Sequence, residues 1–392
     1  MLPRWTVSLE GGPRRVNHSS ALIGHRIFMF GGYCMGVNYE VISLIDVHVF
    51  NTYTYRWARI PTEKTTFENI AHVPYMRYGH ASVAIDNKVY LWGGRNDSFG
   101  ACNVLHCFNT GKLHWKKVPL KGTYPGARDG HAMCVVNSKI YIFGGYEQEA
   151  DCFSNQMFMI DLKEKMWHFI QAKGGIPASW RDFHTITSHG DLIYVFGGRG
   201  DVNAPMHSNR DIYDNTLKVF NTKTCEWSNP VNPTSIAPLG RRSHSAFMHG
   251  GCLYIFCGYN GEIDQHFNCL WKFDPDISLW SKVKTVGTLP MARRRQCCCI
   301  HDNRLFMFGG TSPVASSDYY AADNSFFIET DDTNLQDHSD THVLDFNPSL
   351  KTLCILSVIK HRLNMQTLPP KIRSEIRMMT TPNTISRSLS QG

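Results

Sequence analysis

Six copies of a two-residue motif, five of them Gly-Gly, constrain the fold of this chain more than any other feature. Each motif ends the second of two short apolar runs, as in Ala132–Val136 and Ile140–Phe143, which are rich in β-branched and aromatic residues. Residues without a Cβ let the backbone turn sharply where such a strand ends. The motifs are Gly31-Gly32, Gly93-Gly94, Gly144-Gly145, Gly197-Gly198, Cys257-Gly258 and Gly309-Gly310. The chain is therefore predicted to contain six related β-hairpins.

A third apolar strand and then a tryptophan follow each of the first five motifs. The third strands end near Phe50, Phe108, Ile160, Phe220 and Phe273, and the tryptophans are Trp57, Trp115, Trp167, Trp227 and Trp280. This order resembles the kelch repeat, in which each copy of roughly 50 residues folds as a four-stranded blade of a β-propeller.

The two ends of the repeat array are complementary. Arg4–Leu9 carries Trp5 and looks like a fourth strand without its blade, whereas the third strand of the sixth copy, His342–Phe346, is followed by no tryptophan. Pairing these strands would close the ring and remove two exposed sheet edges. The predicted fold class is all-β: a six-bladed kelch β-propeller over residues 1–348, closed by the N-terminal strand and followed by a short C-terminal α-hairpin.

Composition excludes several classes of protein. Apolar residues make up 42% of the chain, yet no run of 18 could span a membrane. The N-terminus lacks the basic and apolar regions of a secretory signal, which predicts a cytoplasmic location, with the nucleus as an alternative. The thirteen cysteines are odd in number and lack Cys-x-x-Cys spacing, so we expect small buried residues rather than disulfides or a metal site. No metal or cofactor is predicted.

An Arg precedes the first strand of every copy, and a His follows it three residues later in five of the six. The pairs are Arg15 and His18, Arg77 and His80, Arg128 and His131, Arg181 and His184, Arg241 and His244, and Arg293 and Gln296. Because every copy repeats this feature, we interpret these residues as structural hydrogen-bonding groups between blades rather than as ligand contacts.

Two sets of positions vary from copy to copy, namely the two residues between that Arg and His and the residue after the double glycine. Strands one and two are antiparallel, so both positions are predicted to face one opening. Arg199, Arg242, Ser243 and Arg294 would form a cationic, hydroxyl-bearing corner suited to a carboxylate or phosphate. The candidate binding residues are Tyr78, Asp129, Tyr146, Asp182, Arg199, Arg242, Ser243, Tyr259 and Arg294. The alternative is that these are ordinary solvated rim residues.

Charge is unevenly distributed near the C-terminus. Thr311–Ser349 contains eight acidic residues and no Lys or Arg, and it is predicted to be an insertion that forms either a lid or a loop. From Leu350 onward, seven Lys or Arg oppose Glu375 alone, which supplies 7 − 1 = +6 of the net charge of +7. Because aromatic residues do not alternate with these charges, no nucleic-acid partner is predicted.

Helical spacing replaces the β pattern after Pro348. Ser349 can cap a helix that carries Leu350, Cys354 and Val358 on one face, and Leu368, Pro369, Ile372 and Ile376 begin a second short helix. This α-hairpin is predicted to cover residues 349–379, with a flexible tail at 380–392. The alternative for Ser349–Val358 is a fourth strand of the sixth blade, with Leu353 in the tryptophan register.

Taken together, these segments resemble the kelch substrate receptors of cullin 2 RING ubiquitin ligases. Ser-Leu-x-x-x-Cys-x-x-x-Val at 349–358 resembles a BC box, and Leu-Pro-x-x-Ile-x-x-x-Ile at 368–376 is similar to a cullin 2 box. The resemblance implies that Leu350, Cys354 and Val358 bind Elongin C. It implies that Leu368, Pro369, Ile372 and Ile376 bind cullin 2.

The same resemblance implies a ligand. Receptors of this kind bind protein C-termini that end in glycine, often after Arg, Lys or Gln. In the related receptor for diglycine ends, the Arg after the double glycine of blade four holds the terminal carboxylate, which is similar to Arg199 here. That receptor has Ser-Trp where this chain has Arg242-Ser243, and its second carboxylate-binding Arg has no clear counterpart in residues 200–204.

The sequence therefore predicts a non-catalytic substrate adaptor that binds Elongin B/C, cullin 2 with its RING protein, and substrates through their C-termini. The alternatives are a kelch scaffold for an internal peptide or the cytoskeleton, and a metal-dependent kelch enzyme. The enzyme is disfavoured because the rim lacks an obvious cluster of His and carboxylates. Because Gln391-Gly392 is itself a glycine end, self-association through the tail is a further hypothesis, against the alternative of a chance terminus.

Overall fold

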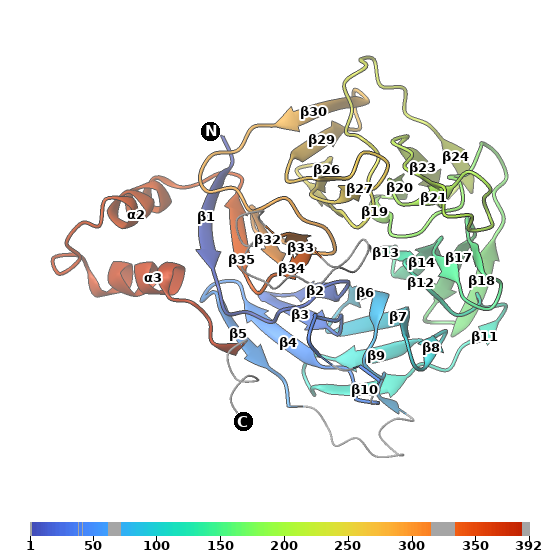
Figure 1. Cartoon of the computed structure of the whole chain (residues 1–392), viewed down its shortest axis with the longest axis horizontal. Helices are drawn as coiled ribbons and strands as arrows, with labels where there is room; N and C mark the ends of the chain where they lie inside the picture. The colour runs from blue at the N-terminus through green and yellow to red at the C-terminus, as the bar shows by residue number, and fades with distance from the viewer. Residues whose placement is uncertain (1, 38, 41, 62–71, 315–333, 386–392) are drawn as a thin grey trace, which may run out of the picture.

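The computed structural model describes residues 2–37, 39, 40, 42–61, 72–314 and 334–385. Its strands form sheets arranged in a ring, with a helical pair projecting from one side and the N-terminal strand beside that pair (Figure 1). The predicted mostly β, propeller-type architecture is confirmed. No helix in the described part of the chain is long and apolar enough to cross a membrane.

Six sheets of four or five strands each make up the described part of the ring. Sheet 1 pairs β2 (Ser19–Ile23), β3 (Arg26–Phe30), β4 (Val47–Asn51) and β5 (Arg56–Arg59) in that order. Sheet 2 pairs β6 (Tyr78–Ile85), β7 (Lys88–Asn96), β9 (His106–Asn109) and β10 (His114–Lys117), with β8 (Gly100–Ala101) on β7. Sheet 3 pairs β13 (Ala132–Val136), β14 (Lys139–Phe143), β17 (Met157–Asp161), β18 (Met166–Ile170) and β11 (Lys121–Gly122).

The other three sheets repeat the same order of pairing. Sheet 4 pairs β19 (Thr185–His189), β20 (Leu192–Phe196), β23 (Lys218–Asn221) and β24 (Glu226–Ser228). Sheet 5 pairs β25 (Ser245–His249), β26 (Cys252–Phe256), β29 (Leu270–Asp274) and β30 (Leu279–Val283). Sheet 6 pairs β31 (Cys297–His301), β32 (Arg304–Phe308), β35 (Thr341–Asp345) and β1 (Arg4–Leu9), so its outermost strand comes from the N-terminus.

Short strands at the rim and two helices complete the fold. The rim strands are β12 (Arg128–Asp129), β15 (Tyr146–Glu147), β16 (Cys152–Phe153), β21 (Gly200–Asp201), β22 (Asp211–Ile212), β27 (Tyr259–Asn260), β28 (Gln265–His266), β33 (Thr311–Pro313) and β34 (Leu335–Asp337). The helices are α2 (Leu350–Lys360) and α3 (Pro370–Thr380). The predicted insertion at 311–349 starts in β33 and returns in β34, while its residues 315–333 lie outside the described residues.

The tryptophans lie where the repeats predict. In five sheets each tryptophan of the outermost repeat strand is directly opposite the apolar residue that ends the third strand, as for Phe50 and Trp57. In sheet 6, Trp5 of β1 lies opposite Leu344 of β35 in the same way. Aromatic rings of this size bury a large apolar area, which packs neighbouring sheets together.

The repeated Arg is a structural hydrogen-bonding group, as predicted, in the second to the sixth copies. The ring nitrogens of His18, His131 and His184, by contrast, have no hydrogen-bond partner in the described part of the chain. Arg77 is fully buried and donates from Nη1 to the carbonyl oxygen of Gly93, 3.3 Å away. Arg128, Arg181, Arg241 and Arg293 make the same bond to the first residue of their own motifs. Each His ring lies against the preceding sheet. A Cβ on Gly93, whose φ is +70°, would lie 2.2 Å from Cε1 of His131, so only glycine fits there.

A closed ring of backbone hydrogen bonds surrounds the central axis, with one residue from each repeat. The N–H of each residue donates to the carbonyl of the residue in the preceding repeat, at 2.7 to 3.1 Å. All six residues have positive φ. They are Asn17, Gly79, Gly130, Phe183, Ser243 and Arg295. We call them the backbone ring.

Helix α2 replaces the fourth strand that was the alternative interpretation of Ser349–Val358, which is therefore wrong. Ser349 caps α2 by accepting a hydrogen bond from the N–H of Thr352 at 3.1 Å. Ile355 of α2 and Met379 of α3 are buried in one apolar cluster with residues of sheets 1 and 6. The helical pair is therefore packed onto the ring beside β1.

The segment after α3 is fixed to the ring at Asn383. The sequence predicts a flexible tail from residue 380 onward, and the structure differs from that prediction at this residue. Asn383 is buried, its side chain accepts from Trp57 N at 3.0 Å and donates to Tyr55 O at 3.2 Å, and its N–H donates to Glu10 O at 2.7 Å. These partners are more than 300 positions away in the sequence, which local patterns cannot reveal. Gln391 and Gly392 lie outside the described residues.

Replacement of Asn383 by alanine is expected to destabilise the protein by roughly 1 to 3 kcal/mol, because buried backbone groups of Trp57 and Tyr55 lose their partners. Urea denaturation would measure the loss, and amide hydrogen exchange at Trp57 should accelerate. Thr384→Ala, at the exposed neighbouring position, is the matched control. Equal stability of the two variants would contradict the proposed anchor.

Candidate functional site

In each repeat the first residue after the repeated Arg lies opposite the residue after the double glycine, at the rim. Asp129 pairs with Tyr146 across β12 and β15, and Tyr78 of β6 pairs with Arg95 of β7. The corresponding bridges in other repeats are Val16 with Tyr33, Asp182 with Arg199, Arg242 with Tyr259, and Arg294 with Thr311. Short antiparallel pairs thus place both variable sets around one opening.

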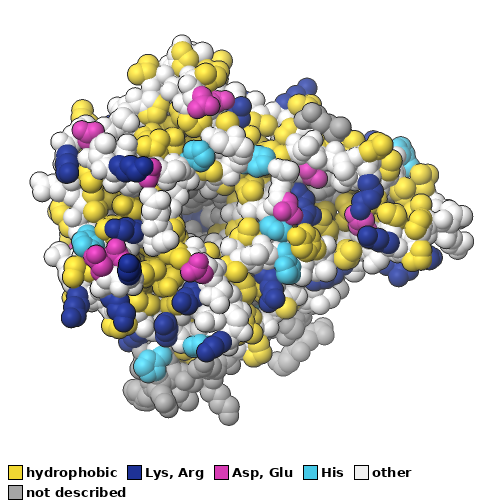
Figure 2. All heavy atoms as spheres, turned by 180° about the vertical axis from the view of Figure 1, so that it is seen from behind, with side chains coloured by type: hydrophobic (Ala, Val, Ile, Leu, Met, Phe, Trp, Pro, Cys, Tyr) yellow, Lys and Arg dark blue, Asp and Glu magenta, His cyan; other side chains and the backbone are white. Residues whose placement is uncertain are grey.

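A pocket of about 520 Å³ lies within this opening. The volume falls in the range of ligand sites, which is about 300 to 1,000 Å³. Six of the nine candidate residues line it: Tyr78, Asp129, Tyr146, Asp182, Arg199 and Arg242. Viewed from behind, the surface of the ring is likewise hollowed at its centre (Figure 2).

The other three candidates are not in the pocket lining. Ser243 belongs to the backbone ring, where it borders a smaller channel of about 120 Å³. Tyr259 and Arg294 are each only 2% exposed, and the Arg294 guanidinium carbon lies 4.3 Å from the centre of the Tyr259 ring. These two residues form a layer behind Arg242, whose guanidinium carbon is 5.5 Å from the same ring. Their direct contact with a ligand is therefore not supported.

Several pocket residues were not selected from the sequence. Arg95 occupies the same position after the double glycine as Arg199, and that equivalence was the available signal. Arg295 and Phe183 are backbone-ring residues whose side chains reach the lining, and Tyr33 accepts a hydrogen bond from Arg295 at 2.7 Å. His207 also lines the pocket, from a loop that carries no repeat signal.

Arg199 is already engaged by a carboxylate of the protein itself. Its Nε and Nη2 donate to the two oxygens of Asp182 at 3.1 and 2.6 Å, and Asp182 is almost completely buried. Burial opposes the charge of Arg199, but Asp182 outweighs it and raises the pKa of the guanidinium. The sequence predicts that Arg199 binds the carboxylate of a ligand. In the structure, most of its hydrogen-bonding capacity is used in the pair with Asp182. Asp182, another of the candidate binding residues, is occupied in the same way.

Arg242 is engaged more weakly than Arg199. Among the described residues its ion pair is a long one, with 4.0 Å between Nη1 and Asp211 Oδ2. Its side chain is 14% exposed and lines the pocket. A guanidinium that is partly desolvated and not bound bidentately is a strong site for an incoming carboxylate. The cationic corner is therefore best represented by Arg242, with Arg295 in the same lining.

The opposite part of the pocket carries acids and phenols. Tyr78 donates to Asp97 at 2.6 Å, and Arg95 donates to the same oxygen at 3.1 Å. Tyr146 donates to Asp151. Asp129 is only 5% exposed, and burial raises the pKa of its carboxyl to about 7. The pocket thus has one cationic end and one end with a buried carboxyl group.

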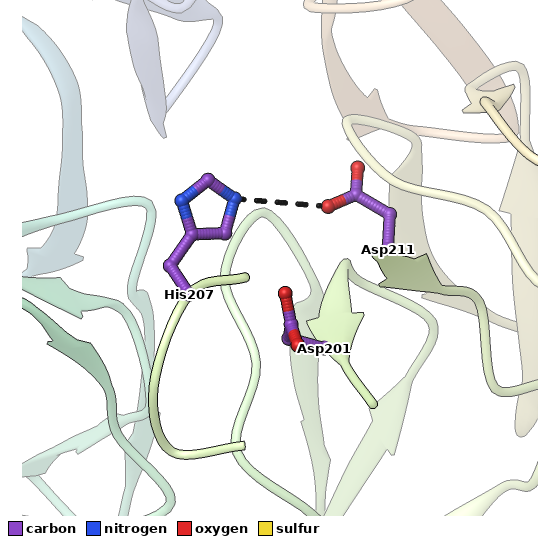
Figure 3. A group of neighbouring side chains, drawn as sticks. All are labelled: Asp201, His207 and Asp211. Carbon is purple, nitrogen blue, oxygen red and sulfur yellow. Dashed lines mark ion pairs between the residues drawn. The ribbon is translucent and has the colours of Figure 1, made fainter. Parts of the chain in front are cut away.

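Asp201, His207 and Asp211 come together beside the pocket, with their ligand atoms within 4.8 Å of one another (Figure 3). Asp201 accepts hydrogen bonds from Ser208 Oγ at 2.5 Å and from the Ser208 and Asn203 N–H groups at 2.7 and 2.8 Å. Burial opposes ionisation of Asp201, but these bonds outweigh it and hold its pKa at about 2. They account for the position of Asp201 without a metal ion.

The helical pair presents a second surface. Leu350 is 76% exposed and Cys354 is also exposed, on the side of α2 away from Ile355. Val358 is half-buried and packs against the apolar cluster beneath the helices. An exposed leucine near a helix N-terminus is a candidate contact for a protein partner.

The predicted cullin-binding residues divide into two groups. Leu368 and Ile372 are half-buried and Pro369 is exposed, so all three reach the surface. Ile376 is only 2% exposed and belongs to the apolar cluster beneath the helices. Its predicted role as a direct partner contact is therefore not supported, because α3 turns that side chain toward the ring.

Comparison with known proteins adds the family context. Residues 79–310 match the family described as the KLHDC2/KLHL20/DRC7 Kelch-repeats domain. The chain is 51% identical over 387 residues to kelch domain-containing protein 3 of Homo sapiens, covering 98% of both chains. The protein of that name from Mus musculus is 50% identical with the same coverage. Host cell factor 2 of Homo sapiens is 28% identical over 255 residues, 62% of this chain and 31% of that protein.

Proposed function

Because this chain belongs to the kelch-repeat family that includes kelch domain-containing protein 3, and is thus a protein-interaction module, we propose that it is a substrate adaptor. In this proposal its pocket binds protein C-termini that end in glycine. Its helical pair binds Elongin B/C and cullin 2, whose RING protein supplies the ubiquitin chemistry. The adaptor itself needs no catalytic group, and it acts in the cytoplasm or the nucleus.

The observation that carries the proposal is the pocket of about 520 Å³ with Arg242 partly desolvated in its wall. A peptide C-terminus offers one carboxylate, which a guanidinium can bind with two parallel hydrogen bonds. Tyr78 and Tyr146 supply amphipathic walls beside the charged groups.

The helical pair supports the assembly part of the proposal. Leu350 and Cys354 are exposed one turn apart on α2, in the register that the BC-box resemblance requires. Packing of Ile355 and Ile376 against the ring fixes the pair relative to the propeller. A bound substrate would therefore be held at a defined position relative to the ligase partners.

We also propose that the six sheets are the six blades of one propeller closed by β1. The antiparallel pairing of β1 with β35, with Trp5 opposite Leu344, supports this closure. The backbone ring supports the count, because it takes one residue from each repeat and returns to its start. A closed ring leaves no sheet edge open to aggregation.

Amidation of the terminal glycine of a peptide ligand is expected to weaken binding by at least about tenfold. The amide removes the negative charge proposed to bind Arg242, and a charge-assisted hydrogen bond contributes roughly 1.5 to 3 kcal/mol. Fluorescence polarisation with matched acid and amide peptides would measure the difference. Equal affinities would show that the terminus is not recognised and would favour a scaffold for an internal peptide.

Two variants make this test specific to Arg242. Arg242→Ala should bind acid and amide peptides with similar, low affinity. Arg95→Ala, which removes a pocket guanidinium paired with exposed Asp97, should retain the preference for the acid. Tandem affinity purification of the full chain then tests the assembly part, since only the adaptor proposal requires Elongin B, Elongin C and cullin 2 in the eluate.

A further inference from the structure

The Asp129 carboxyl group is buried in the pocket wall without a partner in the described part of the chain. No hydrogen bond or ion pair to it is present there, although its side chain is only 5% exposed and lines the pocket. Asp182 differs, because Arg199 binds both of its oxygens, and Asp97 differs, because Tyr78 and Arg95 donate to it. A buried carboxyl group without a donor is costly, so a ligand that supplies the donor gains binding energy.

The surroundings of Asp129 explain why no protein group supplies that donor. Gly79 lies beneath the carboxyl group, and a Cβ at that position would be 3.2 Å from Asp129 Oδ2. The charged and titratable groups nearest to it are Tyr78 on β6, Arg95 on β7 and Asp97 after it, Tyr146 on β15, Asp182 and Arg199. The lining also contains Tyr33, Tyr39, Arg77, His207, Arg242 and Arg295. Burial raises the pKa of Asp129 to about 7, Arg95 opposes the shift and Asp182 adds to it.

We propose that Asp129 binds a cationic side chain of the peptide ligand and releases its proton to solvent when it does so, which makes recognition of that cation dependent on pH. The inference rests on the proposed function of the pocket as a peptide site. When the ligand binds, the carboxyl O–H bond breaks and the proton leaves to water. The carboxylate then accepts hydrogen bonds from the N–H groups of an ammonium or guanidinium group. The ligand charge replaces the proton, so the wall remains neutral.

The direction of the pH effect follows from the free pocket. With a pKa of about 7, Asp129 is mostly protonated at pH 6 and mostly ionised at pH 8. A ligand that binds the carboxylate should therefore bind about tenfold more tightly at pH 8 than at pH 6. A ligand with a neutral amide at that place needs no proton release, and its affinity should change little.

The test uses the full chain and two ten-residue peptides that differ only in the residue before the terminal glycine, Lys in one and Gln in the other. Fluorescence polarisation at pH 6 and 8 should show about a tenfold change for the Lys peptide only. Titration calorimetry of the Lys peptide near pH 6.5, in buffers of different ionisation enthalpy, should show release of most of one proton. Asp129→Asn should abolish both effects.

His207 provides the discriminating control, because it is a second ionisable side chain in the same lining. His207→Gln should retain the pH dependence, whatever its effect on affinity. Persistence of the dependence in Asp129→Asn, or its loss in His207→Gln, would overturn the inference. Binding of the Lys peptide that does not vary with pH would overturn this inference alone. If neither peptide binds at either pH, the proposed function itself fails.

Discussion

Between pH 7.5 and pH 5.5 the five repeat histidines and Asp129 together are expected to lower the free energy of unfolding by about 5 kcal/mol, a large share of the stability of a folded domain. The cause is the set of buried histidines that repeat around the ring. Burial lowers the pKa of His18, His80, His131 and His244 to about 3, and that of His184 well below its usual value. The neighbouring repeat arginines lower each pKa further.

The sign follows from comparing the folded and unfolded states. An unfolded histidine binds a proton as the pH falls below about 6.5, whereas the folded one stays neutral until much lower pH. The stability from each histidine is therefore fully present above pH 6.5 and is lost as the pH falls toward the folded pKa. Each contributes a loss of about 1.4 kcal/mol at pH 5.5, and protonation of Asp129 in the folded state offsets roughly 2 kcal/mol of the total.

The sixth repeat supplies the matched variant for this prediction. Gln296 occupies the histidine position there and donates to Phe256 O at 3.5 Å, as His80 Nε2 contacts Phe30 O at 3.0 Å. His80→Gln should therefore fold and should reduce the acid-induced loss by about 1.4 kcal/mol. Urea denaturation followed by tryptophan fluorescence at both pH values measures the difference. An unchanged pH dependence in the variant would refute the assignment.

Replacement of Leu350 and Cys354 together by aspartate is expected to reduce capture of Elongin B/C at least about a hundredfold while the propeller stays folded. Both side chains are exposed, so the charges cost little in the free protein. At an interface, however, each would be buried without a partner, which costs several kcal/mol, and central contacts are commonly worth 2 kcal/mol or more. Co-purification with Elongin B/C measures the effect.

Leu113→Asp is the control, because it also introduces a negative charge at an exposed leucine, in the turn between β9 and β10 of sheet 2. Its φ of 55° also suits aspartate. This variant should retain Elongin B/C, and both variants should retain peptide binding at the pocket. Full capture by a folded Leu350→Asp, Cys354→Asp protein would exclude α2 as the binding surface.

The sequence was informative where a feature recurs and weak where it occurs once. Six copies allow internal comparison, which separated the structural Arg77 and His80 from the variable Tyr78 and led to the rim positions that line the pocket. The Arg199–Asp182 pair could not be predicted, because both residues were assigned to the ligand and only side-chain geometry shows that they bind each other. His207 is in a loop without a repeat equivalent, so comparison between copies could not select it.

Long-range packing explains the errors at the C-terminus. The helical spacing of Ile372 and Ile376 identified an apolar face of α3 but not which surface covers it, and the ring covers Ile376. Asn383 reads as part of a polar tail, yet its partners are Trp57, Tyr55 and Glu10, near the start of the chain. No pattern within a short window contains that information.

The backbone ring has a consequence for how this chain can acquire new ligands. Its six hydrogen bonds join main-chain atoms only, so the geometry of the pocket base does not depend on the side chains around it. Substitutions at Asp129 or Arg242 should therefore change the chemistry of one wall without displacing the others, and effects at well-separated walls should add. The changes in binding free energy measured in libraries that vary one wall at a time could then be added to give the affinity of combined variants. The positions of positive φ, such as Ser243, would exclude β-branched residues.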